Sequence, residues 1–311
     1  CVYEYGRFVT KKTVLIAGAA GFIGRHVARE VSDNGWHVIG LGRSDWLDWR
    51  DYGLATWHSA EVSIDSLMEY AGKLNVVVHC AGGGSVGFSV DNPAVDFDMT
   101  VRTTSIVLEF IRVHSPSTRL VYPSSAAVYG QVNVLPIIEE TPLNPVSPYG
   151  LHKQMAEALC KLYASQFGLS VAIVRLFSIY GTELRKQLLW DACRKLQQGQ
   201  CEFFGTGEEV RDWLHVEDAA KLLFLAAQNA ASTCPVVNAG SGLGVPVKEI
   251  LQHLSNQFGY ELTPKFSSKH KAGDPNAYIA DISKVGMWNW APEISWREGV
   301  AEYVDWYKKC Q

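Results

Sequence analysis

The sequence predicts an α/β fold: a doubly wound parallel sheet with a smaller, mostly C-terminal lobe. Over about the first 175 residues, short β-rich runs alternate with longer amphipathic stretches, and a glycine-rich turn follows the first run directly. Beyond residue 178, helix-like segments are separated by glycine-rich turns instead. Strand–helix alternation builds a parallel sheet with right-handed crossovers and helices on both faces. The loosened pattern that follows predicts the second lobe.

The individual elements follow from local patterns. Residues 13–17 form a continuous apolar run, as in a strand that is buried on both faces. Further strands are expected at 36–39, 55–57, 76–78, 120–122 and 169–174, with a helix around 27–31. In the second lobe, helices are expected at 188–197, 216–228 and 247–258.

Composition and charge exclude several classes of protein. Hydrophobic residues make up 47% and charged residues 19% of the chain, as in globular proteins and unlike disordered or fibrous ones. The charge sum, 28 − 32 = −4, contains no long run of one sign, so a nucleic-acid surface has no support. The longest apolar stretch near the C-terminal half, 222–227, is far shorter than the ~20 residues of a membrane span. We expect neither nucleic acid nor a membrane as partner.

Cysteine and histidine usage bears on metals and location. The seven cysteines are scattered without a C-x-x-C pair, which argues against a disulfide framework and a zinc site. The nine histidines show no metal-ligand spacing, so no metal is expected. The N-terminus lacks the apolar core of a signal peptide. A cytoplasmic location is the natural expectation.

The turn after the first strand has the features of a dinucleotide-binding loop. Gly18, Gly21 and Gly24 have the spacing G-x-x-G-x-x-G and lead into a helix. Such glycines let the backbone approach a diphosphate, whose charge lies at the positive end of the helix. A tight turn without a ligand is the alternative, and the strand–turn–helix context favours binding. Together with the sheet, this is a Rossmann-type arrangement.

The end of the second strand bears on the choice between NAD and NADP. In NAD-binding sheets, an Asp or Glu here accepts hydrogen bonds from the adenosine ribose. In this chain Gly42 replaces the acid, and Arg43 and Ser44 follow. The missing carboxylate makes room for a 2′-phosphate, with which a guanidinium can pair. A solvated loop arginine is the alternative, and we favour NADP over NAD.

Tyr149 and Lys153 are four residues apart in a predicted helix, so their side chains share one face. A tyrosine with the ordinary pKa of ~10 is a poor base at neutral pH. A nearby ammonium and a cationic nicotinamide ring favour the phenolate. Taken alone, however, this spacing usually marks a helix surface.

A second segment indicates a catalytic role for Tyr149 and Lys153. Residues 124–130 read SSAAVYG and follow the fifth expected strand directly. This resembles the SS-x-x-VYG segment of the extended short-chain dehydrogenase/reductase family, the nucleotide-sugar epimerases and dehydratases, whose members share the G-x-x-G-x-x-G spacing. The resemblance implies that Ser125 is the catalytic hydroxyl and Tyr149 the acid/base. It implies that Lys153 tunes Tyr149 and binds the nicotinamide ribose.

The resemblance extends over most of the chain. VRDWLHV at 210–216 is similar to VRDYIHV, whose arginine binds the diphosphate, and 273–281 is similar to a late segment of UDP-glucose 4-epimerases. Cofactor contacts are implied for Gly18, Gly21, Phe22, Ile23, Gly24, Arg43, Ser44, Glu61, Val62, Cys80, Ala81, Gly82, Tyr149 and Lys153. Substrate contacts are implied for Ser85, Ser125, Ser178, Arg211, Lys271 and Tyr278.

Several positions depart from the family pattern. Gly84 replaces a lysine, Thr100 an asparagine and Lys271 an arginine, and Ser178 lies in a segment that loses an asparagine. These changes leave the nucleotide and the sugar open. They leave the Ser–Tyr–Lys chemistry intact.

Dehydratases and decarboxylases of the family carry an acid after the catalytic hydroxyl, where this chain has Ala126 and Ala127. Neither of these two reactions is therefore expected, and three other functions fit the motifs. A 4-epimerase would act on a nucleotide-diphosphate sugar through a transient 4-keto sugar, while a 4-ketoreductase would consume NADPH. A non-catalytic NADP-sensing protein is the third reading. The late segment favours the epimerase, Gly42 and Arg43 favour the reductase, and we hold the epimerase ahead.

The expected organisation follows from these assignments. A dinucleotide-binding domain is expected over residues 11–177, rejoined by about 212–240. A nucleotide-sugar-binding lobe is expected over 178–211 and 241–311. Resembling enzymes often pair through helices of the sheet domain, so a homodimer is a further expectation.

Overall fold

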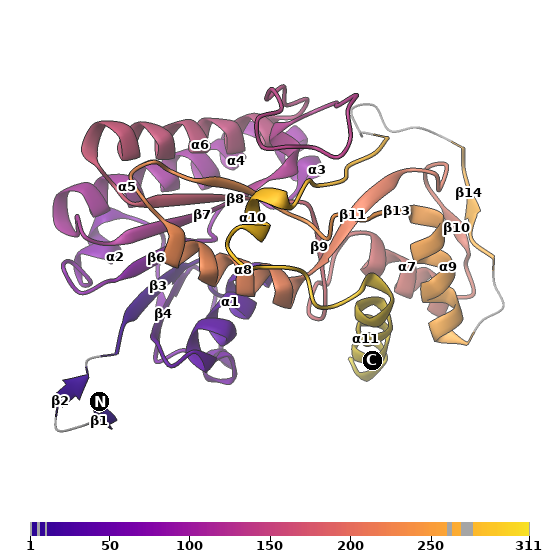
Figure 1. Ribbon diagram of the computed structural model, residues 1–311. Helices are drawn as coiled ribbons and strands as arrows, with labels where there is room; N and C mark the ends of the chain where they lie inside the picture. Colours follow the sequence, from indigo (N-terminus) through magenta and orange to yellow (C-terminus); the bar gives the residue numbers. More distant parts are fainter. Residues whose placement is uncertain (1, 5–6, 10, 260–262, 269–275, 311) are drawn as a thin grey trace. The chain divides into compact units, whose positions relative to one another are not determined.

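The computed structural model describes residues 2–4, 7–9, 11–259, 263–268 and 276–310 (Figure 1). They form two compact units. Unit 1 comprises 1–128, 147–174 and 220–236, and unit 2 comprises 129–146, 175–219 and 237–311. The boundaries differ from the expected ones chiefly at 129–146. That segment lies in unit 2 because Ile137 forms a β-bridge with Ala280 and its carbonyl accepts a hydrogen bond from Asn238.

A seven-stranded sheet has the order β12-β8-β7-β6-β3-β4-β5. Its strands are β3 (Thr13–Ala17), β4 (His37–Gly42), β5 (Thr56–Ser59), β6 (Val76–His79), β7 (Arg119–Ser125), β8 (Val171–Leu176) and β12 (Val236–Ala239). The pairs from β5 to β7 are parallel, with Ile16 of β3 opposite Gly40 and Val78. The strand order reverses direction at β3, as in a doubly wound sheet. The predicted fold class is confirmed, and β12 is a strand that the sequence patterns did not indicate.

The helices of unit 1, among them α8, most of which belongs to this unit, surround this sheet. They are α1 (Phe22–Asp33), α2 (Ile64–Met68), α3 (Val86–Asp91), α4 (Pro93–Phe97), α5 (Thr103–His114), α6 (Pro148–Phe167) and α8 (Val216–Asn229). Short turns of other helix types are η1 (Trp49–Tyr52), η2 (Asp98–Arg102) and η3 (Ala126–Val128). In Figure 1, α5 and α6 lie on one side of the sheet and α1 on the other. The N-terminal strands β1 (Val2–Glu4) and β2 (Arg7–Val9) pair antiparallel.

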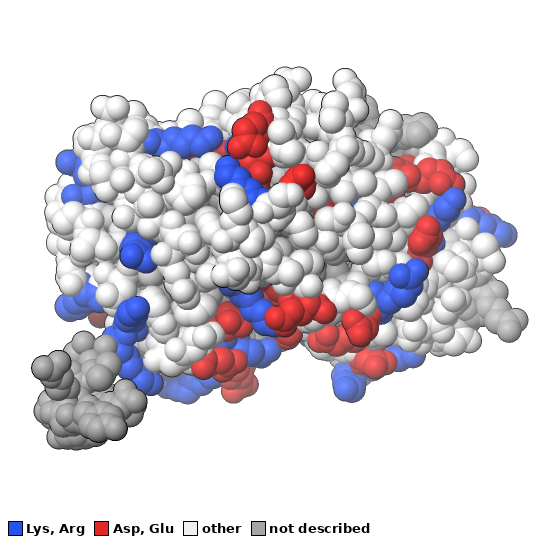
Figure 2. Space-filling model, in the orientation of Figure 1, with Lys and Arg blue, Asp and Glu red and all other residues white. Residues whose placement is uncertain are grey.

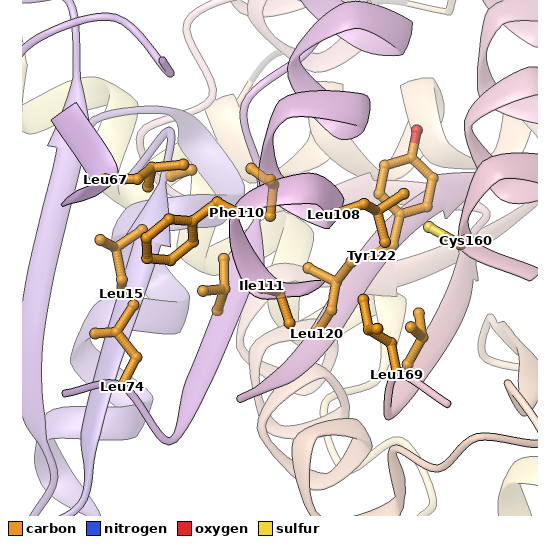
Figure 3. Packing of buried hydrophobic residues seen from close by; sticks show 14 of the residues in the cluster. Leu15, Leu67, Leu74, Leu108, Phe110, Ile111, Leu120, Tyr122, Cys160 and Leu169 are labelled. Carbon is orange, nitrogen blue, oxygen red and sulfur yellow. The ribbon is translucent and has the colours of Figure 1, made fainter. Parts of the chain in front are cut away.

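The core explains why the strands read as continuous apolar runs. Leu15 and Leu120 of the strands, Phe110 and Ile111 of α5 and Cys160 of α6 belong to one buried cluster (Figure 3). Helices on both sides of a parallel sheet remove the side chains of its central strands from water. The carboxyl ends of the strands therefore emerge from a rigid platform.

Unit 2 has smaller sheets. β13 (Gly244–Pro246), β11 (Val210–His215) and β9 (Ser178–Tyr180) form one in that order, and β10 (Glu202–Phe203) pairs in parallel with β14 (Lys265–Phe266). Its helices are α7 (Gln187–Gln197), α9 (Val247–Phe258), α10 (Ser283–Gly286) and α11 (Trp296–Lys309). The buried Asp212 accepts hydrogen bonds from the backbone of Ser241, Gly242 and Ala280. This carboxylate ties β11 to the two segments beside it.

Two surface properties bear on partners. None of the helices in the described part of the chain combines the length and the apolar content needed to cross a membrane. On the face shown in Figure 2, acidic and basic side chains of the described residues occur side by side. This mixture matches the small net charge of −4.

Candidate active site

The glycine loop after β3 has a shape that only glycine permits. Gly18 has a φ of +82°, and a Cβ added there would lie 2.6 Å from the backbone nitrogen of Ala81. A Cβ on Gly24 would lie 2.3 Å from the carbonyl oxygen of Gly18. Heavy atoms do not approach so closely without a bond, so side chains are excluded at both positions. The loop consequently packs directly against the segment that follows β6.

The same loop leads into a helix that fits an anion. Gly21 is the N-cap of α1, and within the described residues no side chain caps this helix. The first backbone N–H groups of a helix, here including Phe22 and Ile23, lack carbonyl partners inside the helix. Such groups at the positive end of a helix bind phosphates. The loop therefore fits the diphosphate of a dinucleotide.

The segment after β6 lies against both the glycine loop and α6. Burial raises the pKa of Cys80 to about 12, so its side chain is a neutral thiol. Gly82 has a φ of +152°, and a Cβ added there would lie 3.9 Å from Nζ of Lys153. The structure thus brings three predicted cofactor segments together within unit 1. They are the glycine loop, the end of β6 and the lysine of α6.

Helix α6 presents Tyr149 from its first turn. Pro148 begins the helix, and the Ser147 side chain caps it by accepting a hydrogen bond from the Gly150 amide at 3.2 Å. Proline at this position suits a helix start because its missing N–H would have no partner there. The Tyr149 amide donates to the buried hydroxyl of Ser89 at 3.0 Å. These contacts hold the backbone that carries the phenol.

Tyr149 and Ser125 lie close together, and the pKa of the phenol differs from the expectation. Ser125 lies at the end of β7, and its side chain is near enough to the Tyr149 phenol to affect its pKa. Burial raises the pKa of Tyr149, and the negative charge of Asp96 raises it further, whereas the Ser125 side chain lowers it. The net shift is upward. The expected lowering by Lys153 does not contribute to this shift, whose direction is set by burial because desolvation disfavours the phenolate.

Lys153 is held in an environment that disfavours its charge. Its side chain is buried, and Nζ donates to the carbonyl oxygen of Pro123 at 2.9 Å. Burial lowers its pKa to about 8, although Asp96 and Glu157 act in the opposite direction. An amine with this pKa exchanges protons near neutral pH. Lys153 can therefore change its charge during a reaction.

Two buried carboxylates flank this group, and no motif in the sequence indicated them. Asp96 is fully buried and lies 2.6 Å from Nδ1 of His152. Glu157 accepts a hydrogen bond from Ser124 at 2.6 Å. The partners of these carboxylates, His152 and Ser124, immediately precede Lys153 and Ser125 in the chain, so their positions follow from the motifs. Nothing in the linear sequence shows that a carboxylate faces each of them.

The cofactor contacts predicted at Arg43, Ser44, Glu61 and Val62 lie on neighbouring segments at the edge of the sheet. Gly42 of β4 is opposite Ser59 of β5, so the segments that follow these strands are neighbours. Nη1 of Arg43 lies 3.9 Å from Oε1 of Glu61, and both side chains are mostly exposed. Ser44 is exposed and Val62 is half-buried. Exposed pairs of this kind contribute little to stability, so Arg43 can exchange partners.

The predicted substrate contacts are spread over both units. In unit 1, Ser85 caps α3 by accepting a hydrogen bond from the Phe88 amide at 3.4 Å. In unit 2, Ser178 begins β9 and Arg211 lies in β11, and both are half-buried. Lys271 lies outside the described residues.

Tyr278 is firmly placed within unit 2. Its hydroxyl donates to the carbonyl oxygen of Gly130, and its backbone N–H donates to Val210 at 3.0 Å. Its ring packs edge-on against Phe177, with 6.1 Å between centroids. A hydroxyl anchored to the backbone fixes the position of the ring. Among the residues that the structure describes, no group of three or more His, Cys, Asp or Glu side chains is placed to hold a metal ion.

Comparison with known proteins decides the family. Residues 14–240 match the model of the NAD dependent epimerase/dehydratase family. The chain belongs to this family. Membership confirms the resemblance drawn from the motifs and the predicted class, an enzyme that depends on NAD or NADP.

Individual relatives of this family member match over nearly their full length. A protein of Methanocaldococcus jannaschii, provisionally named UDP-glucose 4-epimerase, is 31% identical over 306 residues, covering 95% of this chain and 98% of the relative. The UDP-glucose 4-epimerase of Thermotoga maritima, solved with UDP-glucose, has a TM-score of 0.87 and 26% identity, covering 96% and 99%. MoeE5, solved with UDP-glucuronic acid and NAD, has a TM-score of 0.86 and 26% identity, covering 96% and 100%.

Proposed function

We propose that the protein is a nucleotide-sugar 4-epimerase that acts through a transient 4-keto sugar, with Tyr149 as acid and base. One observation carries the proposal. Ser125 at the end of β7 lies close enough to the Tyr149 phenol to lower its pKa, and Lys153 is buried one turn further along the same helix. The names of the relatives support the reaction type, since two of those compared are UDP-glucose 4-epimerases by name.

The properties of Tyr149 suit both directions of proton transfer. Because burial raises its pKa, the phenol keeps its proton at neutral pH and can donate it to a keto oxygen. Taking a proton from a sugar hydroxyl requires positive charge nearby, which Lys153 can supply when protonated. Ser125 can donate a hydrogen bond to the same sugar oxygen. The coenzyme supplies hydride acceptance and return.

The coenzyme is proposed to be NADP, held by the glycine loop and the end of the sheet. The amides at the start of α1 bind the diphosphate, and Cys80, Ala81 and Gly82 line the cofactor beside Lys153. Arg43 and Ser44 contact the 2′-phosphate, and Glu61 and Val62 are further contacts to the coenzyme. Support comes from Gly42, which leaves the strand end without the acid typical of NAD sites.

The substrate is proposed to be a UDP-sugar, since the two solved relatives compared here bind UDP-glucose and UDP-glucuronic acid. Arg211 is proposed to contact the diphosphate, and Ser85, Ser125, Ser178 and Lys271 other parts of the substrate. Tyr278 is proposed to limit the size of the sugar pocket, because its ring is anchored at both ends. A homodimer and a cytoplasmic location stay predictions from the sequence.

One experiment tests the reaction. The protein is incubated with UDP-, GDP- and dTDP-hexoses, with and without added NADPH, and the products are followed by NMR. A substrate deuterated at C4 should give the C4 epimer with the label retained, because an epimerase returns the same hydride. Stoichiometric oxidation of NADPH with a 4-keto sugar would identify a reductase instead. Coenzyme binding without turnover of any sugar would indicate the sensing protein.

A further inference from the structure

The end of β4 is covered by an indole ring. Gly40 and Gly42 lie on the same face of β4, and Trp57 of β5 is the residue opposite Gly40. A Cβ added at Gly42 would lie 2.7 Å from Cη2 of Trp57, and one added at Gly40 would lie 2.9 Å from its Cε3. Non-bonded carbon atoms prefer separations of about 3.5–4.0 Å. At Gly40 the Cδ2 atom of Leu54 would be nearer still, at 2.3 Å, whereas at Gly42 the three nearest atoms all belong to Trp57. Trp57 therefore fills the space that a side chain at Gly42 would need.

The ring of Trp57 has little freedom to move away. It packs edge-to-face against Trp46 with 5.3 Å between centroids, and Trp46 packs against Tyr52 at 5.1 Å. The Arg25 guanidinium lies over the ring of Trp46 at 5.5 Å and donates to the carbonyl oxygen of Ala20 at 2.7 Å. The aromatic stack is thus tied to the glycine loop. Shifting Trp57 would disturb the stack and the loop together.

The covered position is the one that distinguishes the two coenzymes. A carboxylate at the end of this strand binds the ribose hydroxyls of NAD, and it would repel the 2′-phosphate of NADP. We infer that Trp57 is a specificity-determining residue, whose indole occupies the space of that carboxylate and so keeps the site selective for NADP. Arg43, exposed at the next position, can then pair with the phosphate without an acid at the strand end, by exchanging its exposed contact with Glu61 for the phosphate. This inference rests on the proposed coenzyme site.

The inference predicts that Gly42 and Trp57 act as a coupled pair. Gly42→Asp alone should clash with the indole, lower the melting temperature and weaken binding of both coenzymes. Adding Trp57→Leu to Gly42→Asp should relieve the clash and restore the structure of the strand end. The double variant should bind NAD at least tenfold more tightly than Gly42→Asp alone. It should also prefer NAD to NADP. Residues in contact show such non-additive effects, whereas distant residues do not.

The experiment measures Kd for NAD+ and NADP+ and the melting temperature of the wild type, both single variants and the double variant. Trp36→Leu is the matched control. Trp36 directly precedes β4, at the end opposite Gly42, and its ring packs against Phe224. Gly42→Asp combined with Trp36→Leu should show no rescue. Gly42→Ala, alone and with Trp57→Leu, tests the obstruction without a charge. Gly42→Ala should lower the melting temperature of the wild type, but it should not lower that of the Trp57→Leu variant.

The possible results separate this inference from the proposed function. A Gly42→Asp variant that folds like the wild type and prefers NAD with Trp57 intact would overturn the inference. So would a double variant that binds NAD no better than Gly42→Asp. A wild type that prefers NAD would overturn the proposed NADP preference and the selectivity assigned to Trp57. The Gly42→Ala pair would still decide whether the indole excludes a side chain.

Discussion

Replacing Lys153 with methionine should make the protein more stable while removing its activity. The ammonium is buried and has the Pro123 carbonyl as a hydrogen-bond acceptor. Its pKa falls from 10.5 to about 8. At 1.36 kcal/mol per unit, a fall of about 2.5 units means that the charged lysine destabilises the fold by about 3 kcal/mol at neutral pH. Methionine fills a similar volume without charge.

The lost hydrogen bond offsets part of this gain. A single hydrogen bond contributes ~0.5–1.5 kcal/mol, so Lys153→Met should raise the free energy of unfolding by about 2 kcal/mol at pH 7. The pH dependence has a definite sign. Because folding lowers the pKa, the destabilisation is complete below about pH 8 and disappears above the unfolded value of 10.5. The advantage of the variant should therefore shrink between these two pH values.

Urea unfolding followed by circular dichroism, at pH 7, 9 and 10.5, measures the effect on the protein without coenzyme. Lys73→Met is the matched control, since Lys73 also donates to a backbone carbonyl at 2.9 Å, that of Glu69, but is exposed. The control should change stability by less than ~0.5 kcal/mol. A Lys153→Met variant that is less stable than the wild type at pH 7, or equally advantaged at every pH, would refute the reasoning.

Three further predictions concern the site. Tyr149→Phe should lower turnover by ~10²-fold or more with coenzyme affinity unchanged, because only the proton-transferring hydroxyl is lost; activity within a fewfold of wild type would contradict the assigned role. Arg43→Ala should weaken NADP+ binding by ~1–2 kcal/mol in titration calorimetry while NAD+ binding changes little, since the 2′-phosphate loses one charged partner, an exposed guanidinium; equal losses for both would count against the phosphate contact. Tyr278→Cys should raise kcat/KM for an N-acetylhexosamine substrate relative to the plain hexose, because a smaller side chain opens the pocket. A wild type that already prefers the N-acetylated sugar would contradict that assignment.

Much of the sheet and the catalytic helix could be predicted because their signals are local. The strand β3, the glycine loop and α1 occupy consecutive residues 13–33, and the positive φ of Gly18 is a local reason for glycine in this loop. Helix α6 is indicated by Pro148 and by apolar residues at helical spacing. Backbone preference and hydrophobic period act over a few residues, so a short stretch of sequence contains them.

The protonation states and the steric limits of the site depend on residues far apart in the chain. The sequence indicated that Tyr149 and Lys153 share a helix face, but burial sets the direction of both pKa shifts. Likewise Gly42 showed only that an acid is missing, whereas the contact with Trp57 shows what occupies its place. Desolvation and close packing arise from the whole set of neighbours around a group. A linear sequence names those neighbours without placing them, so only the tertiary structure decided these properties.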